Sequence, residues 1–319
     1  MLPKSIKSGD TIGVIAPSDL IREKDLEYIN KSKKMFKDLG YKVKFGKNVS
    51  KNTLSYGATA KQRAEDINEM FADKEVNAII VVRGGADSNC TFDYIDYELI
   101  KNNPKIICGF SDSTSITNVI YSKTGLITFN GPTFKSLTSW ETDYGFKEMI
   151  KRFQDKNLSL GVEEDEYITI QEGIVEGKLV GGNLSLTTRL VAGKYSLDFK
   201  DKILFIEELG FESDPNLVNS NLYYMKQNGI FDKIKGIWVG NYEHESRISL
   251  EKILLDVLDG EYNFLIIKSN NFGHCDKKTV IPIGTKTKID TRKDKKIILV
   301  EECVIWTFWG RGKKSSSDT

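Results

Sequence analysis

Short apolar runs alternate with amphipathic segments through the first half of the chain. The apolar runs that predict buried strands lie at residues 11–16, 41–45, 76–82, 105–108 and 126–130. Apolar residues recur at broadly helical spacing in residues 23–39, 61–72 and 114–123. This alternation predicts an N-terminal α/β domain with a parallel sheet that is covered on both faces. Ligands of such sheets bind at the carboxyl ends of the strands.

The pattern changes at residues 156–176, which are acidic and show little helical periodicity. We expect a linker or loop there. Beyond it, helices are predicted at 184–190 and 216–228, strands at 203–207, 236–240 and 264–267, and a β-rich end at 296–308. The predicted organisation is therefore an N-terminal domain at 1–155, a C-terminal β-rich α/β domain at 177–310, and a disordered tail at 311–319.

Charge and cysteine usage exclude several classes of function. The chain has 46 Lys and Arg against 45 Asp and Glu, so it lacks the basic field of a nucleic-acid-binding protein. The densest cationic run, residues 286–296, is expected to be a solvated hairpin or loop. The four cysteines of the chain are dispersed singly, which indicates neither a zinc site nor a disulfide framework. No cofactor is indicated either.

Targeting signals are weak as well. The first residues have no long apolar core of the signal-peptide kind, and residues 78–82 are too few to span a bilayer. We therefore expect a cytoplasmic protein that does not contact membranes.

The segment Lys105-Ile-Ile-Cys-Gly-Phe-Ser-Asp-Ser-Thr-Ser115 joins a predicted strand to a predicted helix. A sharp turn at Gly109 would expose the hydroxyl of Ser111 above backbone N–H groups, which is how a nucleophilic serine is presented. The alternative is that residues 111–114 only compete to cap the helix. Cys108 is a rival nucleophile, although its place inside the apolar strand favours packing.

A serine nucleophile needs a base and an acid that orients the base. The chain has two histidines, His244 and His274, and both follow predicted strands. Position alone does not separate them, and either could be structural. Glu207 closes the strand at 203–207 and could orient a histidine, whereas its neighbour Glu208 is expected to reach water because alternate side chains point to opposite faces.

Glycines follow the strand at 76–82. Gly84 and Gly85 would offer backbone N–H groups without obstruction by side chains. They could equally form a flexible turn or a phosphate cradle, but neither GxxxxGK[ST] nor GxGxxG occurs in the chain.

Taken together, these segments resemble the LD-carboxypeptidase and microcin-immunity family of serine peptidases. The resemblance runs in order over nearly the whole chain, and its motifs are Gly9-Asp-Thr-Ile-Gly-Val-Ile-Ala-Pro-Ser18, Arg83-Gly-Gly-Ala-Asp-Ser-Asn89, Asp93-Tyr-Ile-Asp-Tyr97, Asn103-Pro-Lys-Ile-Ile-Cys-Gly-Phe-Ser-Asp-Ser-Thr114, Thr128-Phe-Asn-Gly-Pro132, Gly177-Lys-Leu-Val-Gly-Gly-Asn-Leu-Ser185, Ile203-Leu-Phe-Ile-Glu-Glu208, Gly273-His274 and Ile281-Pro-Ile-Gly284. Each motif is weak alone, and their shared order makes the resemblance specific.

The resemblance implies a Ser–Glu–His triad divided between two domains of a cytoplasmic homodimer. Its nucleophile falls on Ser111, its acid on Glu207 and its base on His274, which selects His274 over His244. Its oxyanion hole falls on the backbone N–H groups of Gly85 and Asp112. No metal or cofactor takes part.

Two substrate classes follow from the resemblance: murein tetrapeptides cut at an L–D bond, and aminoacyl-nucleotide toxins. Residues 84–89, with two glycines followed by Ser-Asn, resemble the immunity-like branch. That branch uses a tryptophan before the Gly-Gly-Asn motif to stack on adenine, whereas residues 155–177 contain only Tyr167 as an aromatic. A non-catalytic protein that binds a small molecule in the interdomain cleft is the alternative function, because a fold alone does not fix an activity.

Overall fold

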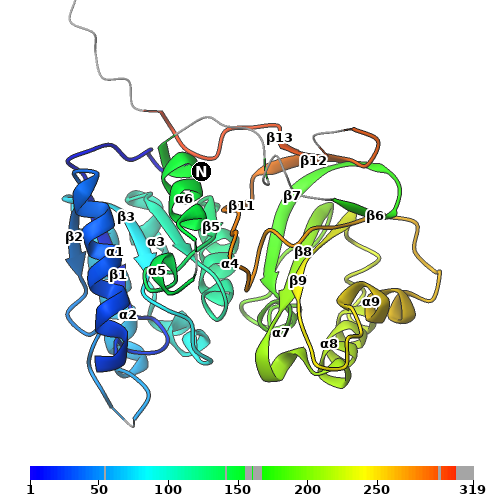
Figure 1. Ribbon diagram of the computed structural model, residues 1–319, viewed down its shortest axis with the longest axis horizontal. Coiled ribbons are helices and arrows are strands. Elements are labelled where there is room, and N and C mark those ends of the chain that lie inside the picture. The colour runs from blue at the N-terminus through cyan, green and yellow to red at the C-terminus, as the bar shows by residue number, and fades with distance from the viewer. Residues whose placement is uncertain (54, 141, 155–159, 161–166, 294–295, 307–319) are drawn as a thin grey trace, which may run out of the picture.

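The computed structural model describes residues 1–53, 55–140, 142–154, 160, 167–293 and 296–306. Two sheets lie side by side, each with its own helices (Figure 1). This arrangement confirms the predicted two-part α/β fold. The expected tail at 311–319 lies outside the described residues.

The first sheet has the strand order β11-β5-β4-β3-β1-β2. Its parallel strands are β1 (Thr11–Ile15), β2 (Lys42–Phe45), β3 (Val76–Val81), β4 (Ile106–Gly109) and β5 (Thr128–Asn130). The helices of this half are α1 (Leu26–Asp38), α2 (Ala60–Ala72), α3 (Tyr97–Asn102), α4 (Ser113–Thr124), α5 (Ser136–Ser139) and α6 (Tyr144–Gln154), with short 3-10 helices at Glu23–Asp25 and Ser88–Tyr94.

Both faces of this sheet are covered, as the apolar strand patterns predict. In β3, Ala78 and Ile80 belong to one hydrophobic cluster, which includes Phe36 of α1. Ile79 and Val81 belong to a second cluster, which includes Ile67 of α2. Successive side chains of β3 therefore face two different helix layers, and both layers exclude water from the sheet.

The second sheet has the order β13-β12-β7-β8-β9-β10-β6. Its strands are β6 (Ile168–Gln171), β7 (Ile174–Asn183), β8 (Lys202–Glu208), β9 (Gly236–Tyr242), β10 (Leu265–Lys268), β12 (Lys286–Asp290) and β13 (Ile297–Leu299). Strands β7 to β10 run parallel, whereas β6, β12 and β13 pair antiparallel at the margins. The helices are α7 (Leu184–Thr188), α8 (Pro215–Gln227) and α9 (Leu250–Leu258), and Gly210–Ser213 forms a 3-10 turn.

One expectation for this half needs correction, and another agrees with the structure. Residues 168–171 and 174–176, which we expected in a linker, form β6 and the start of β7, because Ile168 and Ile170 alternate with polar residues along an edge strand. The cationic run at 286–296 begins as strand β12 and returns as part of a β12–β13 hairpin, which agrees with the hairpin alternative.

Strand β11 (Ile281–Ile283) leaves the second half and joins the first sheet, antiparallel to β5. These residues fall within the predicted C-terminal domain, and no local pattern signals the crossing. Helix α4 packs nearby against β7, α7 and β11 (Figure 1). The chain between β10 and β11 therefore crosses the junction next to the start of α4.

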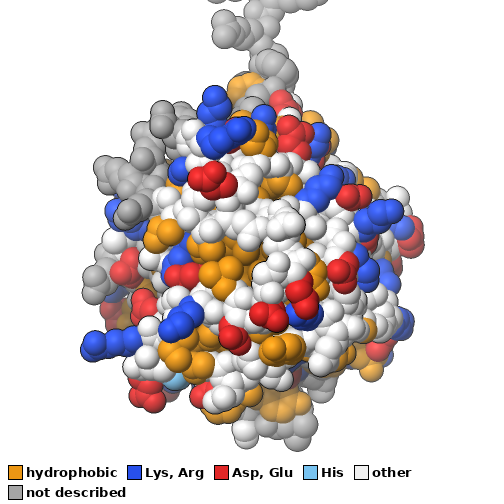
Figure 2. Space-filling model, turned by 90° about the vertical axis from the view of Figure 1, so that its right-hand side faces the viewer, with side chains coloured by type: hydrophobic (Ala, Val, Ile, Leu, Met, Phe, Trp, Pro, Cys, Tyr) orange, Lys and Arg blue, Asp and Glu red, His pale blue; other side chains and the backbone are white. Residues whose placement is uncertain are grey.

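Charge is mixed on the face that Figure 2 shows, where Lys and Arg are interspersed with Asp and Glu around small groups of hydrophobic side chains. This agrees with the near balance of charge in the sequence. Within the described residues, none of the helices combines the length and the apolar character that a bilayer crossing needs.

Candidate active site

Ser111 occupies a tight turn between β4 and α4. Its backbone φ is +60°, a left-handed conformation that costs a non-glycine residue strain. Gly109 ends the strand and Ser113 begins the helix, so only three residues make the turn. This is the geometry that the sequence predicts for an exposed serine hydroxyl on a strand-to-helix elbow.

Helix capping does not account for the polar turn. Asp112 occupies the N-cap position of α4, and its side chain makes no capping hydrogen bond. The Thr114 hydroxyl instead accepts a hydrogen bond from the backbone N–H of Asn183 at 3.1 Å, so it ties α4 to the second sheet. The interpretation of residues 111–114 as competing caps is therefore wrong.

His274 lies in the loop after β10, next to the carboxyl end of β8. Its Nδ1 atom is 2.7 Å from Oε2 of Glu207, and the Glu207 side chain is 1% exposed. Glu207 has no hydrogen-bond partner for its other oxygen among the described residues. With Nδ1–H donated to the carboxylate, the imidazole keeps Nε2 free to accept a proton.

Gly273 explains why the histidine loop can approach the strand so closely. A Cβ atom at this position would lie 2.6 Å from Cγ and Oε2 of Glu207, and the residue has a φ of +92°. Any side chain would push the loop away from the carboxylate. The glycine thus sets the short distance between Glu207 and His274.

The Ser111 turn and the His274 loop meet through Phe110. Its ring centroid is 4.9 Å from that of His274, and Phe110 directly precedes Ser111. Among the described residues, Ser111 forms no side-chain hydrogen bond with His274. Such catalytic contacts commonly tighten only when substrate is bound.

A glycine loop lies over the serine. A Cβ atom at Gly84 would be 2.9 Å from Oγ of Ser111 and 3.6 Å from the backbone nitrogen of Asp112. A Cβ at Gly85 would be 2.1 Å from Oγ of Ser18. Both positions exclude larger residues, so at Gly84 the backbone rather than a side chain approaches Ser111.

Asp112 holds this glycine loop in place, a role that the sequence did not indicate. Its carboxylate accepts a hydrogen bond from the backbone N–H of Ser88 at 2.8 Å, and the Ser88 hydroxyl donates to its carbonyl at 2.9 Å. Burial raises the pKa of the Asp112 carboxyl. The two hydrogen bonds between Ser88 and Asp112 link residues 84–88 to the Ser111 turn.

Glu208 does not reach water, contrary to expectation. It is buried and accepts hydrogen bonds from Asn183 Nδ2 at 2.5 Å and from the backbone N–H of Ser185 at 2.8 Å. Burial, followed by the nearby charge of Glu207, raises its pKa to about 7. Its partner Asn183 lies in the Gly-Gly-Asn motif, but the motif alone does not indicate this contact.

The rival residues lie elsewhere or are inert. The Cys108 thiol is fully buried within β4, and desolvation raises its pKa, so it is a poor nucleophile. His244 stands beyond the end of β9, where its Nδ1 accepts a hydrogen bond from the backbone N–H of Ser246. Within the described residues, no cluster of three His, Cys, Asp or Glu side chains could bind a metal ion.

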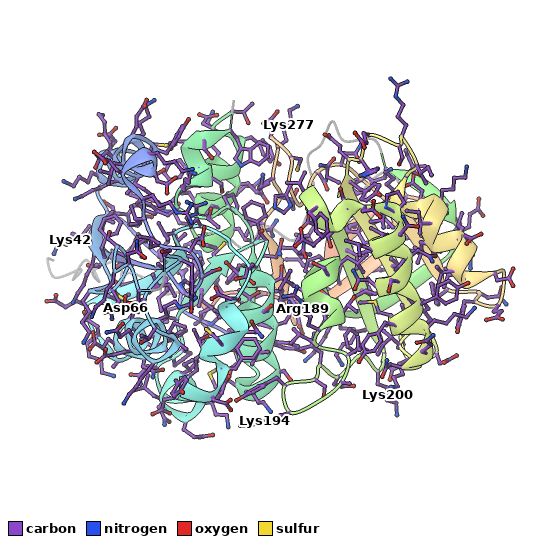
Figure 3. The ribbon with its side chains drawn as sticks, turned by 90° about the horizontal axis from the view of Figure 1, so that it is seen from below. Lys42, Asp66, Arg189, Lys194, Lys200 and Lys277 are labelled. Atoms are coloured by element: carbon purple, nitrogen blue, oxygen red, sulfur yellow. The ribbon has the colours of Figure 1, made fainter. Side chains whose placement is uncertain are left out.

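Arg189 and Lys277, which are both labelled in Figure 3, lie along the junction between the two halves. Arg189 follows α7, and its Nη1 reaches the carbonyl of Ala86 in the glycine loop at 3.4 Å. The second half therefore contacts the glycine loop as well as the Ser111 turn.

Two family models match this chain, one in each half. The model described as the LD-carboxypeptidase N-terminal domain matches residues 12–131, and that of the LD-carboxypeptidase C-terminal domain matches residues 176–289. A probable murein peptide carboxypeptidase from Bacillus subtilis is 30% identical over 93% of this chain and 93% of its own length.

Solved structures are similar over almost the full length. An MccF-like protein from Bacillus anthracis has a TM-score of 0.86 at 30% identity and covers 93% of this chain and 98% of its own. MccF in complex with glutamyl sulfamoyl guanosine has a TM-score of 0.87 at 26% identity, covering 95% and 99%. The chain belongs to the LD-carboxypeptidase family, whose members include MccF-like proteins.

Proposed function

We propose that this protein is a serine-type carboxypeptidase that hydrolyses an amide bond with Ser111, His274 and Glu207. The observation that carries the proposal is the 2.7 Å hydrogen bond between His274 and Glu207, beside the ring contact with Phe110. The positive φ of Ser111 supports it, because strained residues of this kind cluster at functional sites. Carboxypeptidase activity is also the named property of the relative from Bacillus subtilis.

In the proposed reaction, Oγ of Ser111 attacks the carbonyl carbon while Nε2 of His274 takes the hydroxyl proton. Glu207 holds the imidazole through Nδ1–H and stabilises the imidazolium that forms. The oxyanion is stabilised by the backbone N–H groups of Gly85 and Asp112. His274 then protonates the leaving amine, and water repeats the sequence on the acyl-enzyme.

The substrate has two candidate chemistries. A murein tetrapeptide would lose its terminal D-amino acid, and an aminoacyl sulfamoyl nucleoside would lose its aminoacyl group. Residues 84–89 favour the immunity-like branch, and the similar protein MccF has been solved in complex with glutamyl sulfamoyl guanosine. The homodimeric state and cytoplasmic location are predictions that rest on the family resemblance.

Hydrolysis of both substrate classes by the purified protein tests the proposal. We expect the wild type to release the terminal D-amino acid or the free sulfamoyl nucleoside, and a loss on the order of 10⁴ to 10⁶-fold in Ser111→Ala. Ser113→Ala, two residues further along at the start of α4, is the matched control and should retain activity. Cleavage of the D-Ala tetrapeptide alone would place the chain in the murein branch. Tight binding without turnover would favour the non-catalytic alternative.

A further inference from the structure

Lys278 is a buried cation that the proposed reaction does not use. Its side chain is only 2% exposed. Its Nζ donates a hydrogen bond to the carbonyl of Cys275 and stands 3.8 Å from the ring centroid of Trp140 and 4.8 Å from that of Phe110. Two aromatic faces therefore replace the water that an ammonium group normally holds.

These contacts join the two halves of the molecule at the site. Trp140 and Phe110 belong to the first half, whereas Lys278 lies four residues after His274 in the loop that leads to β11. Phe110 in turn packs on the His274 ring at 4.9 Å. A continuous stack thus runs from Trp140 through Lys278 and Phe110 to His274.

Keeping a cation there costs stability. Among the described residues Lys278 has no salt-bridge partner, and burying an ammonium group without one is unfavourable. Burial lowers its pKa to about 8, while the Cys275 thiol, Glu207 and Asp276 act in the opposite direction. A methionine of similar length would fill the space without this cost.

We propose that Lys278 is a positioning residue whose cation, held between Trp140 and Phe110, fixes the 273–278 loop and with it the orientation of the His274 ring. The expected effect on kcat rests on the proposed function, whereas the effect on the orientation of the His274 ring does not. A hydrogen bond from Thr142 to the carbonyl of Asp276 at 3.4 Å anchors the same loop to the first half. The cation supplies the part of this anchoring that depends on charge.

The test compares Lys278→Met with Lys277→Met, its exposed neighbour (Figure 3). We expect Lys278→Met to raise the thermal midpoint below pH 8, because the penalty for the buried charge disappears. Its kcat should fall about 10- to 100-fold while KM changes less than threefold. Lys277→Met should match the wild type in both measurements. An unchanged kcat in Lys278→Met would overturn the inference.

The pH profile separates the cation from the space that it fills. Wild-type kcat should decline as pH rises through about 8, where Lys278 loses its proton. Lys278→Met should show no such decline. Lys278→Arg should remain active to higher pH, because a guanidinium stays charged. A Lys278→Met profile that declines like the wild type would contradict the role of the cation.

An NMR measurement judges the inference even if the protein hydrolyses neither substrate. The chain has two histidines, so the Nδ1 proton of His274 can be assigned by comparison with a His244→Asn variant. We expect a slowly exchanging Nδ1 proton in the wild type and in Lys277→Met, and its loss in Lys278→Met. Persistence of this signal in Lys278→Met would reject Lys278 as the positioning group.

Discussion

Glu207 and His274 are 67 positions apart in the chain, and their side chains meet at 2.7 Å in a nearly dry environment. Glu207 closes β8, and His274 follows β10, with β9 between the two strands in the sheet. Parallel strands bring their carboxyl ends to one edge, which is why residues so distant in sequence become partners there.

Glu207→Gln should abolish most of the activity without unfolding the protein. Glutamine keeps the volume and one acceptor oxygen, but it removes the negative charge that stabilises the imidazolium. We expect kcat to fall on the order of 10³ to 10⁴-fold, as when a triad acid is neutralised elsewhere. Steady-state kinetics on the preferred substrate measure this.

The two histidines provide the control for this experiment. His274→Asn should lose activity to a similar extent, and the double variant with Glu207→Gln should lose little more, because groups that act as a unit are not additive. His244→Asn should keep wild-type kcat. A fully additive double variant would show that the pair does not act together.

Gly84→Ala should impair catalysis more than folding. The added methyl group would lie 2.9 Å from Oγ of Ser111 and 3.0 Å from its Cβ, where the substrate carbonyl must approach. We expect kcat/KM to fall at least about 100-fold, which corresponds to about 3 kcal/mol of transition-state stabilisation. Gly173→Ala, whose methyl group would have its nearest contact with Leu265 at 3.3 Å, is the control for adding a methyl group and should keep full activity.

Cys108→Ala should leave the activity intact. The thiol is fully buried in β4 and its pKa is raised by desolvation, so it cannot provide a thiolate nucleophile. The change should cost about 1 kcal/mol of unfolding free energy, since it removes one packed atom from the core. Denaturant unfolding and hydrolysis assays on the same preparation check both. A loss of activity without unfolding would reinstate Cys108 as a rival to Ser111.

The sequence predicts the strands and helices that local patterns define, and it misses contacts that distant segments create. The alternation of strands and helices in residues 11–130 and the turn at Ser111 follow from apolar spacing and from glycine. Strand β11 has three residues including Pro282, so its pairing with β5 has no local signal. Helix α9 was also missed, although its apolar residues follow helical spacing.

The residues of the site also fall into two groups, those that can be recognised from the sequence and those that cannot. Ser111 and its flanking glycine loops are recognisable from residue type and from their place at strand ends. The environments of Glu208 and Lys278 cannot be recognised from the sequence, because their partners Asn183 and Trp140 come from distant parts of the chain. A charge beside a strand end is expected to be solvated unless its partners are known.

Glu208 should make stability depend on pH. Its pKa is raised to about 7 in the folded protein, so between pH 4.5 and 7 the folded state binds more protons than the unfolded state. Unfolding free energy should therefore fall as pH rises through this window, by at most about 3 kcal/mol from this group. Denaturant titrations at pH 5 and pH 8 measure the difference.

Glu208→Gln removes this contribution because an amide does not titrate. We expect its unfolding free energy to change less between pH 5 and pH 8 than that of the wild type. At pH 8 two effects oppose each other in the variant: a buried charge is lost, and one of the acceptors for Asn183 Nδ2 and the Ser185 N–H becomes a donor. The slope with pH, not the absolute stability, is therefore the diagnostic quantity. Equal slopes in the two proteins would show that Glu208 stays ionised throughout, held by those donors despite its burial.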